Sequence, residues 1–167
     1  FRQAIAYSID RQQIIDSVTR KHPQARVNGV AVEPMVVRRN GRELMVGVIR
    51  DPVFGPAIAF GAGGVAIEVH KDRAVALPPL NSFLVTEMIR GTRVSKLLGP
   101  FRKMPAVNLH ALEEVLLRVS ELVCALPWVV DMEINPFLAD ESGCIAVDAR
   151  VAIDPDHLDK DPRFSHM

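Results

Sequence analysis

Aromatic residues are scarce in this chain, and cysteines are scarcer still. Only 5% of the 167 residues are aromatic whereas 49% are hydrophobic, so any core must be built mainly from aliphatic side chains. That supply excludes disorder over most of the length, and the length suits one domain or a large piece of one. The two cysteines, Cys124 and Cys144, form no Cys-x-x-Cys pair. A structural zinc site is therefore not expected, and a disulfide is not indicated.

The chain also lacks an excess of charge and any long apolar run. Twenty basic residues balance twenty acidic ones, giving a formal net charge of +0, so we expect no nucleic-acid partner and no electrostatic membrane anchor. No segment approaches the roughly 18 apolar residues of a membrane span, and no leader pattern is recognisable. We therefore expect a cytoplasmic protein. Because the sequence starts at Phe1, we also expect it to be a piece of a longer protein.

The periodicity of apolar residues predicts an α+β fold, mainly an antiparallel sheet with packed helices. Asn108 is expected to cap the clearest helix, and Asn40-Gly41 indicates a hairpin with a tight primed turn. Helices are predicted over residues 9–22, 81–90, 92–98 and 109–123. Strands are predicted over residues 27–37, 43–49, 57–60, 67–69, 74–77, 129–138 and 144–153. We predict one folded region over residues 1–153 and a polar linker to a following domain over residues 154–167.

Three oxygen-bearing side chains near the end of the chain suggest a metal site. Glu133 and Asn135 are two apart in a predicted strand, so they share a face. An antiparallel return through a short turn can place Asp148 beside them. Two carboxylates and an amide oxygen suit a magnesium ion that also holds nucleotide phosphates. A solvated strand face with a turn-forming Asn-Pro is the other interpretation.

These residues also carry a resemblance to a known family. Glu133-Ile134-Asn135-Pro136 followed by Asp148-Ala149-Arg150 resembles the end of the ATP-grasp module in succinyl-CoA synthetase β chains and in nucleoside-diphosphate-forming (NDP-forming) acyl-CoA synthetases. The resemblance implies that Asn135 and Asp148 hold magnesium, with Glu133 a weaker third ligand. Phe137 and Arg150 stand where that family usually has Leu and frequently Lys.

Three further blocks resemble the same family in the same order. Residues 29–35 resemble its hinge strand, which implies that Glu33, Pro34, Met35 and Val36 contact the adenine end of ATP or ADP. Residues 42–47 resemble the partner strand, whose acid here is Glu43. Residues 51–64 resemble its "D-P-x-F-G-P … G-x-G-G" run, which ends in Gly63 and Gly64. From the residues alone, Glu33 and Glu43 could be ordinary exposed acids. The two glycines could form either a tight turn or a nest of backbone amides for an anion.

The resemblance implies the C-terminal portion of an ATP-grasp module in an NDP-forming acyl-CoA synthetase, which transfers a phosphoryl group through a phosphohistidine. Its partners would be the nucleotide, an upstream CoA-binding region and the upstream N-terminal part of the module, in the same protein or in a partner subunit. The chain alone is not expected to turn over. One alternative is a regulatory synthetase-like region of a protein lysine acetyltransferase, since the tail from Phe164 to Met167 resembles the segment that leads into the acetyltransferase domain. Another is a silent module for subunit contacts.

Overall fold

The computed structural model describes residues 16, 20–21, 35–64 and 72–154. The chain divides into two units, residues 1–37 and 38–167. In the first unit, Asp16, Arg20 and Lys21 are helical, in agreement with the helix predicted over residues 9–22, most of which lies outside the described residues. Most of the strand predicted over residues 27–37 also lies outside them, and residues 35–37 are not in a strand.

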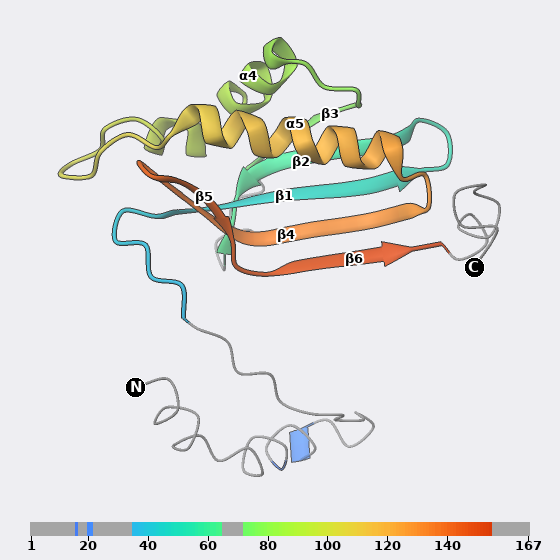
Figure 1. The fold of residues 1–167 in the computed structure, drawn as a ribbon, viewed down its shortest axis with the longest axis horizontal. Helices are drawn as coiled ribbons and strands as arrows, with labels where there is room; N and C mark the ends of the chain where they lie inside the picture. Colours follow the sequence, from blue (N-terminus) through green and yellow to red (C-terminus); the bar gives the residue numbers. More distant parts are fainter. Residues whose placement is uncertain (1–15, 17–19, 22–34, 65–71, 155–167) are drawn as a thin grey trace. The chain divides into compact units, whose positions relative to one another are not determined.

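The second unit is an antiparallel sheet with helices, which confirms the predicted α+β class (Figure 1). The strands follow the order β3-β2-β1-β4-β5, and β6 also pairs with β4. Their bounds are Arg42–Asp51 for β1, Gly55–Ala62 for β2, Arg73–Ala76 for β3, Val129–Asp140 for β4, Gly143–Ala146 for β5 and Ala149–Ile153 for β6. The helices are α4, Ser82–Arg90, and α5, Leu109–Ala125, with a short 3₁₀ helix at Val94–Leu97.

Both α-helices lie on one face of the sheet, and the core fills the space between (Figure 1). Alternate residues of β1 point into this core, where Leu44, Val46 and Val48 are buried, because successive side chains of a strand face opposite ways. From α5, Leu112 and Leu116 reach the same core at helical spacing. Each such burial stabilises the fold by roughly 1.5–3 kcal/mol. The remaining side chains of each strand point to the opposite face of the sheet, here called the open face.

An asparagine side chain caps the N-terminus of each α-helix, as predicted for α5. The Asn108 side chain accepts a hydrogen bond from the backbone N–H of Ala111 at 3.1 Å, and Asn81 accepts one from Leu84 at 2.9 Å. Each cap satisfies a backbone donor that has no partner within the helix. No helix in the described ranges combines the length and apolar character that a membrane span needs.

The helix predicted over residues 92–98 is wrong, since only the four residues Val94–Leu97 form a 3₁₀ helix there. The Asp72 carboxylate accepts hydrogen bonds from the backbone N–H groups of Arg93, at 2.6 Å, and Val94, at 2.8 Å. The segment is thus fixed at its start, and Gly99-Pro100 follows directly. So few residues between a break and a proline favour the tighter 3₁₀ turn.

The hairpin predicted at Asn40-Gly41 is also wrong. A turn does form, with the Gly41 N–H donating to the Arg38 carbonyl at 3.1 Å. Neither Asn40 nor Gly41 has a positive φ, so the turn is not of the primed type. The strand that follows is not the returning half of a hairpin, because β1 pairs with β2 on one side and with β4 on the other.

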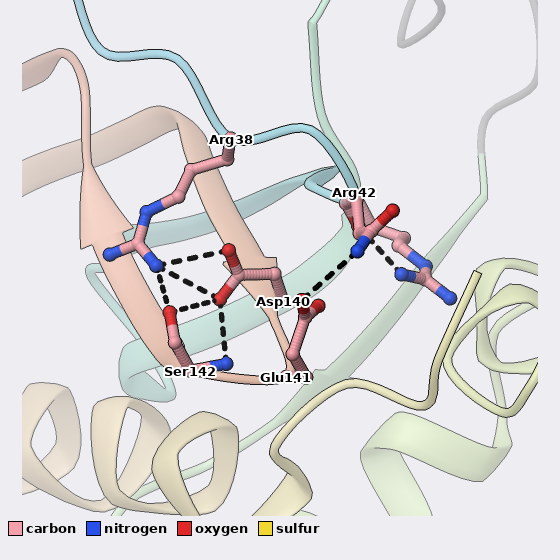
Figure 2. Close-up of polar contacts among 6 residues, drawn as sticks. Arg38, Arg42, Asp140, Glu141 and Ser142 are labelled. Atoms are coloured by element: carbon pink, nitrogen blue, oxygen red, sulfur yellow. Dashed lines mark hydrogen bonds and ion pairs between the residues drawn. The ribbon is translucent and has the colours of Figure 1, made fainter.

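A partly buried ion pair fixes the turn between β4 and β5 (Figure 2). Both Asp140 carboxylate oxygens accept from Arg38 Nη1 at 3.0 Å, and the Asp140 side chain is only 8% exposed. Asp140 also accepts from the backbone N–H of Ser142 at 2.9 Å and from its hydroxyl at 2.6 Å, and Arg38 donates to the same hydroxyl. Hydrogen bonding from the Ser142 hydroxyl and backbone, supported by Arg38, holds the pKa of Asp140 below its ordinary value despite burial.

A second arginine fixes a long loop against β1. Arg42 is 6% exposed and donates to the backbone carbonyls of Asn40, Leu97, Gly99 and Pro105 at 2.6–3.3 Å. A buried guanidinium that meets only carbonyl oxygens is stabilised through hydrogen bonds rather than an ion pair. The loop from Leu97 to Pro105 is therefore tied to the first residue of β1.

The Asp140 cluster generates a pH-dependent prediction. Replacing Asp140→Asn should lower the free energy of unfolding at pH 7 by about 1–3 kcal/mol, because a charged acceptor is lost. Since folding lowers the pKa of Asp140, its contribution is present above the unfolded-state value of about 4 and is lost as the pH falls through the folded-state value. The difference between the two proteins should therefore shrink below about pH 4.

Urea unfolding, followed through the fluorescence of the single tryptophan, Trp128, measures this difference. Glu141→Gln is the matched control, because its exposed side chain accepts one hydrogen bond from Asn40, which a glutamine can still accept. An equal loss at pH 3 and pH 7 would contradict the assigned role of the Asp140 charge.

Candidate functional site

The open face of β4 carries the polar residues singled out in the sequence. Glu133 and Asn135 are half-buried. Met132, which precedes Glu133 in the strand, points to the other face and is buried in the core. The pairing of β1 with β4 shifts between Val46↔Ile134 and Leu44↔Phe137. This β-bulge returns Phe137 to the core and leaves Asn135 on the same side as Glu133.

Asp148 lies directly opposite Asn135. The Asn135 N–H donates to the Asp148 carbonyl at 3.1 Å, in the gap between β5 and β6. The flanking pairs Ile134↔Ala149 and Phe137↔Ala146 have one register, in which residue 135 faces residue 148. The predicted juxtaposition of these two residues is confirmed, whereas their role as metal ligands stays a prediction.

A small cavity of about 100 Å³ is formed by these residues, and its lining consists of Glu133, Asn135, Asp148 and Arg150. The lining offers two carboxylates and one amide oxygen, the hard oxygen donors that magnesium prefers. Within the described residues, no three His, Cys, Asp or Glu side chains cluster in a way that could hold a metal ion. The two carboxylates of the cavity, Glu133 and Asp148, match the usual magnesium arrangement, in which one or two carboxylates act together with phosphate and water oxygens.

Hydrogen bonds fix the orientation of the Asn135 amide. Its Nδ2 donates to Glu133 Oε1 at 3.1 Å, and its Oδ1 accepts from the Gly64 N–H at 2.9 Å. The amide oxygen has a second lone pair, which these contacts leave for a further partner.

Gly63 and Gly64 allow the chain to pass close to β1. A Cβ at Gly63 would lie 2.3 Å from the Leu44 carbonyl oxygen, and one at Gly64, whose φ is +69°, would lie 1.8 Å from Glu43 Oε2. The Gly63 N–H donates to the Glu43 carbonyl at 2.9 Å. Since the Gly64 N–H donates to Asn135, the glycine pair joins Glu43 to the cavity residues. A direct contact of the pair with phosphate stays a prediction.

The predicted adenine-contacting residues are only partly described. Glu33 and Pro34 lie outside the described residues, and Met35 and Val36 belong to the first unit. Their contact with a nucleotide therefore stays a prediction.

A larger groove on the open face was missed by sequence reasoning. Its volume is about 320 Å³, and Glu133 lines both the groove and the small cavity. Small residues at Gly47, Ala57 and Ala59 leave the space unfilled. In the two predicted strands that carry them, these small residues alternate with large apolar residues. That alternation was the signal in the sequence that could have indicated the groove. The remaining lining residues are Met45, Val48, Ile49, Arg73, Val75, Asp131 and Met132.

Cys144 is not suited to act as a nucleophile here. Both cysteines are free thiols, and burial raises the pKa of Cys144 to about 11. Because the thiolate is the reactive form, this thiol is essentially protonated at neutral pH.

Comparisons with known proteins agree on one family. Residues 3–153 match the profile of a family described as ATP-grasp domain. The chain is 39% identical over 141 residues to Acetate--CoA ligase [ADP-forming] I of Archaeoglobus fulgidus, covering 84% of this chain and 20% of that protein. It is 38% identical over 140 residues to the subunit beta of Acetate--CoA ligase [ADP-forming] I of Pyrococcus furiosus, covering 84% of this chain and 60% of the subunit.

A solved structure shares the fold. The dinucleotide forming acetyl-coenzyme A synthetase 1 of Ca. Korarchaeum cryptofilum, in complex with coenzyme A and Mg-AMPPCP, aligns with a TM-score of 0.66 and 35% identity, covering 68% of this chain and 54% of that one. The phosphohistidine segment of that protein is described as pointing towards its nucleotide binding site. The chain thus spans less than two thirds of these relatives.

The close approach at the glycine pair generates a stability prediction. Gly63→Ala should lower the free energy of unfolding by about 1–3 kcal/mol, because the added methyl group meets the backbone of a buried strand that cannot move aside. Gly99→Ala is the control, since a Cβ there would meet no atom within 4 Å. Chemical denaturation of both variants measures the difference. Equal stabilities would show that the chain at Gly63 can shift without cost.

Proposed function

The chain belongs to the family of ATP-grasp domains, and from that membership we propose that it forms the ATP/ADP- and magnesium-binding part of an NDP-forming acyl-CoA synthetase. Its relatives are named as ADP-forming acetate–CoA ligases, one as a whole protein and one as a subunit beta.

The observation that carries the proposal is the position of Asn135 opposite Asp148, with Glu133 in the same cavity. These are the residues that the family resemblance assigns to magnesium. A magnesium ion bound there would neutralise charge on the nucleotide phosphates and position them for transfer. Asn135 would act through the free lone pair of its amide oxygen, held in place by Gly64 and Glu133.

The nucleoside end is proposed to lie on the Glu43 side of the cavity. Glu43 starts the open face of β1, and the glycine pair links it to Asn135. The hinge residues Glu33, Pro34, Met35 and Val36 are proposed to contact the adenine, as the resemblance implies. The groove adjoins the cavity at Glu133, on the side away from Glu43 along β1. We assign it to the group that exchanges the phosphoryl with the nucleotide.

Other parts of the enzyme are proposed to complete the reaction. We place the phosphohistidine, the CoA-binding region and the N-terminal part of the module in other regions of the same protein or in a partner subunit. The short coverage of the relatives and the phosphohistidine segment named for one of them support this arrangement. The cytoplasmic location likewise stays a prediction.

The names of the relatives favour a synthetase over the two alternatives. The acetyltransferase interpretation was based on Phe164 to Met167, which lie outside the described residues. An acetyltransferase domain encoded after this chain, or the absence of a phosphohistidine region before it, would favour a regulatory role. If the full-length protein bound neither ATP nor ADP in the presence of magnesium, a silent module would be the better interpretation.

The magnesium assignment generates the third prediction. In the full-length protein, Asp148→Asn should weaken magnesium-dependent ADP binding by about tenfold or more, because one of two anionic ligands is lost. Isothermal titration of ADP at a series of magnesium concentrations measures the effect.

Glu114→Gln, on the exposed side of α5, is the control and should bind like the unaltered protein. The magnesium site would be refuted by an Asp148→Asn variant with unchanged magnesium dependence. Separately, acyl-CoA cleavage by the 167-residue chain alone would contradict the assignment of catalytic residues to other regions.

A further inference from the structure

We propose that Arg150 binds the phosphate group that the metal ion holds, and so acts as a nucleotide-binding residue. The proposal rests on the function proposed above and adds a residue to that site. Arg150 stands at a position where the family that the chain resembles frequently has Lys.

The backbone places Arg150 on the same face as the proposed metal ligands. It follows Asp148 by two residues, pairs with Glu133 across β4 and β6, and lines the cavity of about 100 Å³. Residues two apart on a strand, and residues directly opposite on neighbouring strands, point to the same side of a sheet. The spacing that identified Glu133 and Asn135 therefore also identifies Arg150.

The guanidinium of Arg150 has no partner among the described residues. It makes no ion pair there, even with Glu133 opposite, and no side-chain hydrogen bond. Arg42 and Arg50 of β1 donate to backbone carbonyls and Arg38 pairs with Asp140, whereas Arg73 of β3, like Arg150, has no partner among the described residues. Arg150 is exposed and lines the cavity, so its five donors are available to a ligand bound there.

The charge of the cavity explains which ligand such an arginine would take. Glu133, Asp148 and Arg150 together carry one net negative charge, and a divalent cation would change it to one net positive charge. An anion then becomes favourable, and a phosphate offers oxygens to the metal and to the guanidinium at once. Arginine binds phosphate through a planar fork of two hydrogen bonds, which lysine cannot do.

The competing explanation is that Arg150 only balances the charge of Glu133. In that case its removal would change metal binding or stability and would leave the nucleotide affinity at saturating metal unchanged. The two roles are separated by measuring metal and nucleotide binding independently.

The test uses the full-length protein with four sequences: unaltered, Arg150→Met, Arg150→Lys and Arg118→Met. Arg118 is the matched control because it is an exposed arginine on α5, paired with Glu121. Binding of MgADP is measured by calorimetry, and binding of Mn²⁺ alone by electron paramagnetic resonance. Arg150→Met should weaken MgADP binding by about tenfold or more, as expected for a lost charge-assisted hydrogen bond.

The same variant should bind Mn²⁺ no more weakly than the unaltered protein, since a positive charge beside the cation has been removed. The MgADP affinity of Arg150→Lys should lie between those of the unaltered protein and Arg150→Met, because lysine keeps the positive charge but cannot form the pair of hydrogen bonds. Arg118→Met should bind MgADP normally.

Two results overturn the proposal in distinguishable ways. If Arg150→Met binds MgADP within about twofold of the unaltered protein, or if Arg118→Met loses as much, Arg150 does not bind the phosphate and the proposed function stands. If the unaltered protein binds no MgADP, the proposed function fails and this proposal fails with it. Melting temperatures of all four proteins show whether a loss of MgADP affinity reflects unfolding. If Arg150→Met is unfolded, Arg150→Lys provides the test.

Discussion

The register of β4 against its neighbours is the constraint on which the site depends. The hydrogen bond from the Asn135 N–H to the Asp148 carbonyl aligns two residues that are thirteen apart in sequence. On its other side, β4 pairs with β1 through a bulge that turns Asn135 and Phe137 to opposite faces. A slip of one residue would exchange the polar and apolar faces of the strand. Core packing of Phe137 and the placement of Asn135 are thus settled by the same pairing.

The helices pack against one face of the sheet only, so the side chains of the open face remain available to bind ligands. Both helices cover the face that carries Leu44, Val46 and Val48, so the residues between them in β1 need no apolar partner (Figure 1). Along that open face, the glycine pair, the polar cavity and the groove lined by small residues follow one another. The sheet places Glu133, Asn135 and Arg150 on strands, while Asp148, between β5 and β6, and Gly64, after β2, complete the site from the adjoining loops.

Local signals predicted most of the fold, and long-range pairing accounts for the wrong hairpin at Asn40-Gly41. The cap at Asn108 and the alternation in β1 are properties of neighbouring residues, so they could be read from the sequence. The partner of β1 could not, because the turn signal at Asn40-Gly41 says nothing about β4, nearly a hundred residues later.

The site was predictable to the same extent. Asn135 and Asp148 lie in one hairpin, so their spacing in the sequence is enough to predict that they meet. The groove combines residues of β1, β2, β3 and β4, and their pairing could not be predicted from spacing. Glu133 lines both the cavity and the groove. A cation bound in the cavity and a ligand bound in the groove would therefore influence each other's binding through this one side chain, because a cation that draws the carboxylate to one side alters the electrostatic potential on the other. By reciprocity, a ligand in the groove would change the affinity of the cavity for its ion by the same factor.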